Sequence, residues 1–265
     1  MSLVKVHNLS AGYSKENILE NVSFEINEGE LLGVLGENGS GKSTLVKAIC
    51  NVLPHYGEVY IAGDKIEDLK VLQTAKKISY IPQHSGLGID ISVLDVVMMG
   101  FNSRLKLLEN PSLTMQKEAM EIINLLGLSE NADKNYMELS EGQKQLTIIA
   151  RALVSDGTLL VMDEPESTLD FSVRSKTMNI VKKWIGNGKR AGLIILHDIV
   201  LALNNCDKLI LVKNKNIVST IDVHHDRIEL MEEKLRTIYG DISLGKVKNK
   251  KGRDIFYIVC DSEDI

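Results

Sequence analysis

The chain has 265 residues, of which 44% are hydrophobic, 25% charged and 5% aromatic. That length suits one large domain with a substantial apolar core and argues against two full-sized independent domains. The composition argues against long disorder, and the few aromatic residues disfavour an all-β sandwich. A formal net charge of -5 gives no broad attraction for nucleic acid, which we therefore do not expect as a partner.

The three cysteines, Cys50, Cys206 and Cys260, are far apart and lack CxxC spacing. They predict neither a disulfide framework nor a zinc site, and they fit a reducing compartment. No apolar run approaches the roughly 18 to 20 residues that cross a bilayer, and the first residues lack the apolar region of a signal peptide. If the protein serves a membrane, we expect it as a peripheral subunit at the cytoplasmic face.

The N-terminal third alternates between strand and helix patterns. We expect a turn at Gly12 between the first two strands, and Pro54 to stop the first helix. The strand leading to Gly36 is mostly apolar, so a buried strand runs directly into a glycine-rich loop. The predicted strands cover residues 3–9, 22–26, 30–35, 58–62 and 77–81, and the predicted helix covers 42–52.

The centre of the chain has helical periodicity, and the α/β pattern then returns. A helix and a hairpin, turning at residues 248–251, are expected to close the chain. The predicted helices cover 92–100, 115–126, 142–154, 172–185, 199–204 and 227–239, and the predicted strands cover 159–162, 192–196, 209–212, 217–220, 243–247 and 255–260. This order predicts an α/β fold with a helical insertion.

Residues 36–44, GENGSGKST, match GxxxxGK[ST] between a predicted strand and a predicted helix. A flexible glycine turn could have the same glycine spacing, but it would not need Lys42 and Ser43. Lys42 can reach the β and γ phosphates, and Ser43 can ligate Mg²⁺. The loop therefore predicts binding of a nucleotide with Mg²⁺. Its candidate phosphate-binding residues are Gly36, Asn38, Gly39, Ser40, Gly41, Lys42, Ser43 and Thr44.

Two carboxylates, Asp163 and Glu164, directly follow the apolar strand at 159–162. Ligands of α/β folds collect at the carboxyl ends of strands. Asp163 is a hard oxygen ligand for Mg²⁺, and Glu164 is the candidate to orient or deprotonate an attacking water. Solvated acids after a buried strand would explain this pair alone, but the upstream glycine loop favours catalysis of phosphoryl transfer.

Residues 139–145, LSEGQKQ, resemble the LSGGQ signature of the ATP-binding cassette (ABC) family and lie 23 residues, counted from Ser140, before Asp163. Four more positions resemble family motifs in the family's order. Gln83 resembles its Q-loop, STLD at 167–170 its D-loop with Asp170, and His197 its switch histidine. Tyr13 resembles the aromatic residue that stacks on adenine. Singly each is weak; together they identify an ABC ATPase.

The resemblance implies a P-loop NTPase core with an antiparallel β subdomain and an inserted helical subdomain. The nucleotide-binding domain would cover residues 1–220, its helical subdomain about 87–155, and an extension 221–265. In the family two cassettes dimerise head to tail, so Ser140, Gly142 and Gln143 would meet the γ phosphate of a second copy. Gln83 would contact Mg²⁺ and link the site to a membrane permease.

Three positions depart from the family pattern. Glu141 replaces the second-position glycine of the signature, and we expect its side chain to point outward. Glu166 stands where Thr or Ser is common, and Glu37 where Pro is common in related importers. We assign none of these residues to the chemistry.

The segment LDVVMMGFNSR at 94–104, STLDF at 167–171 and the tail LRTIYGDISLGKV resemble ATPases of importers for iron chelates, haem and cobalamin. Such importers imply a permease groove at about 83–101 and, indirectly, an extracytoplasmic substrate-binding protein. The apolar side chains of this segment are expected to divide between the core and the permease. They are Ile89, Ile91, Val93, Leu94 and Val97.

Four other functions share some of these motifs. A soluble cassette acting on nucleic acid or the ribosome would carry two cassettes, a long coiled coil or a zinc insert, and this sequence has none of them. A small-molecule P-loop kinase has no use for LSEGQ. A regulatory cassette without transport, or the ATPase of another importer, stays open.

Overall fold

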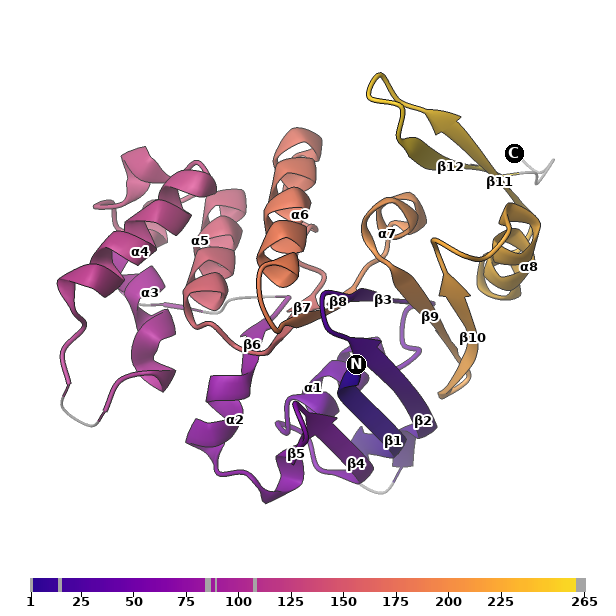
Figure 1. Ribbon diagram of the computed structural model, residues 1–265, viewed down its shortest axis with the longest axis horizontal. Coiled ribbons are helices and arrows are strands. Elements are labelled where there is room, and N and C mark those ends of the chain that lie inside the picture. Colours follow the sequence, from indigo (N-terminus) through magenta and orange to yellow (C-terminus); the bar gives the residue numbers. More distant parts are fainter. Residues whose placement is uncertain (1, 14–15, 84–86, 89, 107–108, 261–265) are drawn as a thin grey trace.

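The computed structural model describes residues 2–13, 16–83, 87–88, 90–106 and 109–260. Its centre is a six-stranded sheet in the order β10-β9-β3-β8-β7-β6 (Figure 1). The last five of these strands run parallel, and only β10 runs antiparallel, against β9. The strands are β3 (Leu31–Gly36), β6 (Ile78–Ile81), β7 (Leu159–Asp163), β8 (Ala191–Ile195), β9 (Lys208–Lys213) and β10 (Asn216–Asp222).

A second sheet is antiparallel, with strand order β2-β1-β4-β5. Helix α1 (Lys42–Ile49) lies between the two sheets, and its Leu45, Val46 and Ile49 share one apolar cluster with both. Burial of this face stabilises the helix, because eight residues alone would not. The strands are β1 (Ser2–Tyr13), β2 (Glu16–Asn27), β4 (His55–Ile61) and β5 (Asp64–Lys65).

The opposite face of the large sheet is covered by helices, which form the larger apolar cluster. Three of them, α3 (Val93–Met98), α4 (Leu113–Leu125) and α5 (Glu141–Val154), lie between β6 and β7 in sequence. They stand to one side of the sheet in Figure 1. The fourth, α6 (Phe171–Gly186), follows β7 and stands beside α5.

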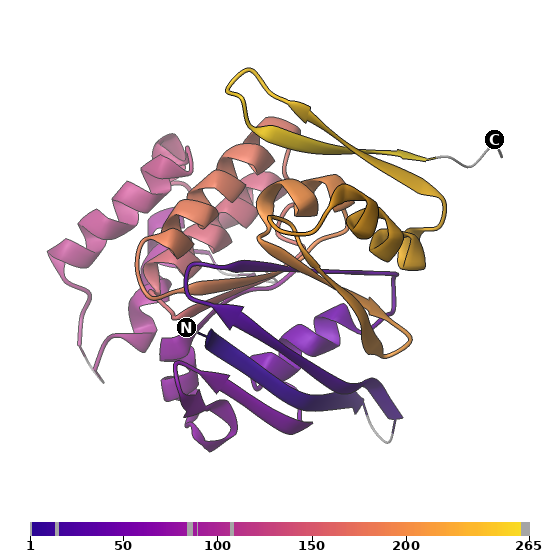
Figure 2. The ribbon, with the colours of Figure 1, turned by 45° about the vertical axis from the view of Figure 1, so that its right-hand side comes forward.

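The last third of the chain finishes the sheet and then covers it. Helix α7 (Ile199–Asn205) leads to β9 and β10, and α8 (Ile228–Tyr239) packs beside them. A two-stranded hairpin, β11 (Ile242–Lys248) and β12 (Asp254–Cys260), lies over α7 (Figure 2). Among the described residues, no helix combines the length and apolar character that a bilayer span requires.

The α/β fold with a helical insertion is confirmed, and the predicted elements are present with shifted ends. The turn at Gly12 is wrong, because Gly12 pairs with Asn17 inside β1 and a Cβ there would lie 2.0 Å from the Glu16 carbonyl oxygen. Helix α1 ends at Ile49 rather than 52, and Asn51 has φ +55. Strand β5 and helix α2 (Val71–Lys77) were missed; α2 buries no residue, so its sequence lacks a clear apolar stripe.

Candidate functional site

The predicted phosphate-binding and catalytic residues gather at one edge of the large sheet. Parallel strands present their carboxyl ends at the same edge, which is where α/β folds bind ligands. Strand β3 ends in the glycine loop, β7 ends at Asp163, and β8 leads through Leu196 to His197. The outer strand β6 leads to Gln83. The topology therefore brings together four segments that are distant in sequence.

The glycine loop has the backbone expected of a phosphate cradle. Gly39 and Gly41 have φ +78 and +101, values that residues with a Cβ rarely adopt. The Ser40 hydroxyl is buried without a hydrogen-bond partner. Lys42 donates from Nζ to the carbonyl oxygens of Gly36 at 2.9 Å and Glu37 at 3.0 Å. The loop thus combines an orphaned hydroxyl with a buried ammonium group, as an anionic ligand requires.

Ser43 and Asp163 meet across the base of the loop. The Ser43 hydroxyl donates to Asp163 Oδ1 at 3.2 Å, and the Asp163 side chain is buried. Burial raises the pKa of Asp163, although the bond from Ser43 opposes this. A desolvated carboxylate beside a hydroxyl fits a hard cation such as Mg²⁺, with phosphate oxygens and water as further ligands. The residues present therefore fit the metal that the fold implies.

Glu164 is held in a rare conformation at the centre of the cluster. Its φ is +50, and its backbone N–H donates to the Ile195 carbonyl at 3.2 Å. Gln83 Nε2 donates to Glu164 Oε2 at 2.5 Å, and His197 Nε2 contacts Glu164 Oε1. Non-glycine residues with positive φ cost about 1 to 3 kcal/mol and concentrate at functional sites. The Glu164 carboxylate thus contacts Gln83 and His197, two residues that the sequence motifs had singled out.

Burial lowers the pKa of the Lys42 ammonium, and the negative charges of Glu164 and Asp163 oppose that effect. The three groups therefore interact electrostatically, although Lys42 begins α1 and the two acids lie at the end of β7. Thr44, the last residue of the glycine loop, is buried, whereas Asn38 and Gly39 are exposed beside a cavity of about 430 Å³.

Tyr13 lies beside α1, close to the loop. Its ring is 48% exposed, and Lys47 Nζ donates to the phenol oxygen at 3.2 Å. The sequence motifs did not indicate Lys47, although its spacing of four from Ser43 places both residues on one helical face. An exposed ring held by a lysine beside a phosphate loop can serve as a stacking platform for a base.

The signature residues occupy a different part of the molecule. Ser140 is the N-cap of α5: its hydroxyl accepts from the Gln143 N–H at 3.3 Å, and Gln143 Oε1 accepts from the Ser140 N–H at 3.1 Å. Gly142 lies against the carbonyl of Thr168. Within the described ranges, no hydrogen bond or ion pair joins Ser140, Gly142 or Gln143 to residues 36–44.

Two further acidic residues flank this end of α5. Glu141 has a side chain that is 74% exposed and is ion-paired with Lys144 at 2.9 Å. Asp170 is the exposed N-cap residue of α6, and its side chain makes no capping bond.

The apolar side chains of the segment expected to meet a permease differ in burial. Val93 and Val97 are fully buried in the core, whereas Ile91 and Leu94 are only partly buried against it. Ile89 lies outside the described residues.

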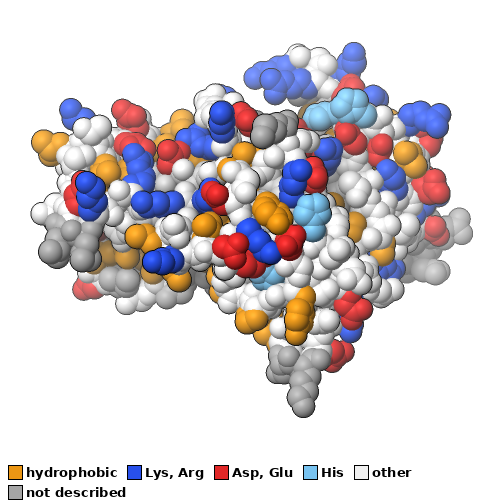
Figure 3. Space-filling view, turned by 60° about the horizontal axis from the view of Figure 1, so that its bottom comes forward, with side chains coloured by type: hydrophobic (Ala, Val, Ile, Leu, Met, Phe, Trp, Pro, Cys, Tyr) orange, Lys and Arg blue, Asp and Glu red, His pale blue; other side chains and the backbone are white. Residues whose placement is uncertain are grey.

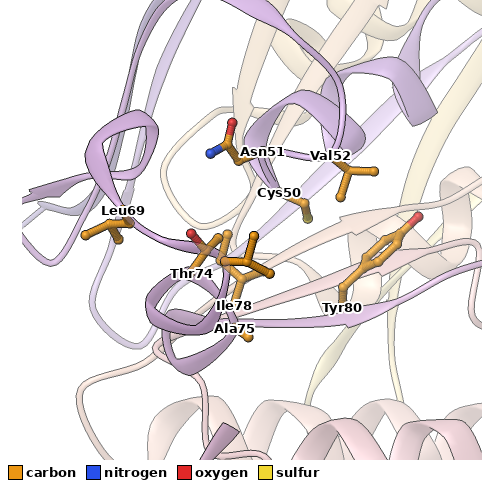
Figure 4. A pocket seen from close by; sticks show the side chains of 9 residues that line it. Cys50, Asn51, Val52, Leu69, Thr74, Ala75, Ile78 and Tyr80 are labelled. Carbon is orange, nitrogen blue, oxygen red and sulfur yellow. The ribbon is translucent and has the colours of Figure 1, made fainter.

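A further pocket has a volume of about 230 Å³. Side chains from the end of α1, from α2 and from β6 converge around it (Figure 4). None of its lining residues is a predicted site residue. On the face shown in Figure 3, acidic and basic side chains intermix, and neither sign covers a broad area.

Similar proteins agree on one family. A family model described as ABC transporter matches residues 19–167. An uncharacterized ABC transporter ATP-binding protein of Methanocaldococcus jannaschii is 31% identical over 97% of this chain and 91% of its own. A hemin import ATP-binding protein of Vibrio parahaemolyticus is 31% identical over 88% and 89%. A manganese transport system ATP-binding protein of Bacillus subtilis is 31% identical over 81% and 84%.

Solved structures share the fold. A structure described as an inward-facing metal-chelate type ABC transporter superposes with a TM-score of 0.80, 24% identity and coverage of 98% and 99%. A dimeric ATP-binding cassette with bound ADP and Pi, in a post-hydrolysis state, superposes with a TM-score of 0.74 at 28% identity, covering 83% of this chain and 98% of that one.

Proposed function

The chain belongs to the ABC transporter family as an ATP-binding and ATP-hydrolysing subunit, and from this premise we propose that it energises import of a metal chelate or a haem- or cobalamin-type cargo. The convergence of Lys42, Asp163, Glu164 and His197 at one sheet edge is the observation that carries the ATPase function. The relatives named for hemin import and manganese transport, and the metal-chelate type neighbour, support a metal-containing cargo.

The proposed reaction is attack of water on the γ phosphorus of ATP. Glu164 takes a proton from the water as the new P–O bond forms, and the bond to the bridging β–γ oxygen breaks, leaving ADP and phosphate. Gln83 and His197 engage the two oxygens of Glu164 in this structure. During turnover His197 exchanges this contact for the γ phosphate, and Gln83 connects the site to the permease.

Phosphate binding falls to the loop and to the start of α1. Lys42 exchanges its bonds to Gly36 and Glu37 for the β and γ phosphates, and Ser40 donates its unpaired hydroxyl. Ser43, Asp163 and the amide oxygen of Gln83 would hold Mg²⁺. When bound, that ion supplies neutralising charge to the phosphate oxygens. Tyr13 stacks on the adenine.

A second copy of the chain completes each site. Ser140 is exposed and Gln143 is partly buried at the positive end of α5, and among the described residues neither has a hydrogen bond or ion pair to the chain's own phosphate loop. A helix N-terminus favours an anion. We therefore infer a head-to-tail homodimer, in which Ser140, Gly142 and Gln143 of one copy meet the γ phosphate on the other, with Asp170 at the interface. The dimeric neighbour supports this arrangement.

The permease is proposed to dock beside Gln83, on partly buried apolar side chains such as Ile91 and Leu94. Such docking places the chain peripherally at the cytoplasmic face of the membrane. An extracytoplasmic binding protein would deliver cargo to the permease, so cargo specificity lies outside this chain.

Affinity capture of the chain from its native membranes tests this proposal. A transporter subunit should co-purify with a polytopic permease and hydrolyse ATP. Lys42→Ala should lower nucleotide affinity or turnover by roughly one to two orders of magnitude, because it removes a charged phosphate contact. Capture without a membrane protein would support the regulatory alternative, and a Lys42→Ala variant with unchanged nucleotide affinity and unchanged turnover would contradict the site.

A further inference from the structure

The phosphate loop has two flanks, and only one of them carries the proposed chemistry. In the sheet order β9-β3-β8-β7, Asp163, Glu164 and His197 all lie on the β8 side of the loop. On the other side lie the end of β9 and, beyond it, helix α8 of the C-terminal segment. This second flank has no part in the reaction described above.

The end of β9 touches the first residue of the loop. A Cβ on Gly36 would lie 2.4 Å from the Val212 carbonyl oxygen, so only glycine fits at this position. Such close approach leaves no room for solvent between β9 and the loop. The position of β9 therefore constrains where the loop begins.

Lys213, the last residue of β9, joins three elements. Its Nζ donates to the Thr237 carbonyl oxygen at 2.8 Å and lies 3.4 Å from Glu37 Oε1. Thr237 is in the last turn of α8, where helix carbonyls lack partners within the helix and attract a cation. Glu37 is in the loop, and its carbonyl accepts from Lys42. Lys213 thus connects α8 to the residue that the catalytic lysine contacts.

Tyr239, the last residue of α8, makes a second connection. Its phenol interacts with the backbone of Gly36, and burial raises its pKa to about 12. The ring also packs against the large apolar cluster, which fixes it in place. Two side chains at the C-terminal end of α8 and β9 therefore reach the first two residues of the loop.

We propose that α8 of the C-terminal segment braces the phosphate loop through Lys213 and Tyr239, and that this brace sets the affinity for nucleotide. The inference rests on the proposed function of the loop and assigns a role to a segment that lies far from it in sequence. Lys213 and Tyr239 are positioning residues, since they act through Gly36 and Glu37.

The positive charge of Lys213 affects nucleotide affinity in a second way, through Glu37. Glu37 brings a carboxylate next to the site of a triphosphate, and Lys213 is the cation paired with it. The Glu37 side chain is 56% exposed, so screening weakens this interaction but does not remove it. Without Lys213, the Glu37 carboxylate repels the phosphates and the loop loses its tie to α8. Both effects lower the affinity for nucleotide.

The test is calorimetric titration of the full-length chain with ADP. Lys213→Met should weaken ADP binding by about five- to tenfold, because it removes a charged contact to the loop. Lys215→Met is the matched control: Lys215 lies two residues later, in the turn after β9, and pairs with Glu16 and Glu20. We expect its affinity to stay within about twofold of the wild type, since its partners lie outside the loop.

Two further variants separate the brace from general damage. Glu37→Gln in the Lys213→Met background should recover part of the affinity, because the unpaired carboxylate is gone. Tyr239→Phe removes only a hydroxyl and should weaken ADP binding by about two- to threefold, a result that stands even if Lys213→Met does not fold. At saturating ATP, kcat of each folded variant should match the wild type while KM rises.

Equal ADP affinities for Lys213→Met and Lys215→Met, together with wild-type affinity for Tyr239→Phe, would overturn the brace. Lys42→Ala distinguishes a failure of the brace from a failure of the proposed nucleotide site. If Lys42→Ala binds ADP weakly while the brace variants bind normally, only this inference fails. If Lys42→Ala also binds ADP normally and hydrolyses ATP at the wild-type rate, the proposed nucleotide site itself is wrong.

Discussion

Two regions carry most of the predicted site residues, the edge of the large sheet and the start of α5. They differ in how many of the contacts that a nucleotide site needs are already made within one chain. At the sheet edge, Lys42, Asp163, Glu164 and His197 lie at or after the carboxyl ends of three strands and already interact with one another. At the start of α5, the side chains of Ser140 and Gln143 bond to each other's backbone N–H groups, and Ser140 is exposed. A sheet assembles its own site because parallel strands end together, whereas a helix N-terminus on the surface needs a partner to supply the anion.

The difference assigns separate tasks to the two regions. The sheet edge should bind nucleotide and carry the reaction, and the start of α5 should add affinity only when a second copy closes on the first. Changes at the edge are thus expected to affect chemistry and binding within one chain. Changes at α5 should affect association.

The largest expected effect concerns the proposed base. Glu164→Gln should lower kcat by roughly 10² to 10⁴, about 3 to 5 kcal/mol of barrier, because the amide cannot accept the proton. ATP binding should persist, because Lys42 and the loop are unchanged. Steady-state phosphate release and equilibrium ATP binding measure the two effects separately.

Glu30→Gln is a suitable control for that variant. Glu30 is also a buried acid, but it precedes β3 at the opposite edge of the sheet and pairs with Lys208. It should retain the wild-type kcat. Comparable losses of kcat in both variants would mean that any buried acid of this sheet affects turnover equally. The assignment of the reaction to the carboxyl edge of the sheet would then be wrong.

A smaller effect concerns stability against pH. Glu166, next to the proposed base, is buried, and burial raises its pKa to about 7 from 4.5, with Glu164 adding to the rise and Arg174 opposing it. The folded state therefore holds this proton more tightly than the unfolded chain. The resulting stability is complete below about pH 4.5 and is lost as pH rises through 7.

Denaturant unfolding of the wild type and Glu166→Gln checks this shift. Relative to the variant, the wild type should lose about 2 to 3 kcal/mol of unfolding free energy between pH 5 and pH 8. A constant difference over that range would show that Glu166 ionises normally.

The smallest effect concerns Tyr13, the proposed stacking platform for adenine. Tyr13→Ala should weaken ADP binding by about 1 to 2 kcal/mol, as expected for loss of one stacking contact. Tyr13→Phe keeps the ring and loses only the bond from Lys47, so its affinity should stay near the wild type. If Tyr13→Phe binds as weakly as Tyr13→Ala, the hydroxyl rather than the ring supports the nucleotide.

Sequence patterns predicted most of the large sheet and the helices around it, because buried strands and amphipathic helices have strong periodicity. The glycine loop and the acids after β7 could be found from local spacing alone. Helix α2 could not, since it buries no residue. Nor could Lys213, because its contacts to Glu37 and Thr237 depend on how β9 and α8 fold against the loop. The strain at Glu164 was also invisible, since positive φ at a glutamate has no sequence signal.

The proposal that α5 of one copy completes the nucleotide site of another is tested most directly by sedimentation, which measures oligomeric state. The samples are Glu164→Gln with MgATP, with and without Ser140→Arg. We predict an ATP-dependent dimer for Glu164→Gln and a monomer that still binds ATP for the double variant. Ser112→Arg is the control, because Ser112 is likewise an exposed N-cap, of α4, and the dimer should survive there. A Glu164→Gln chain that binds ATP but stays monomeric, or a dimer unaffected by Ser140→Arg, would contradict the claim that α5 completes the site of a second copy.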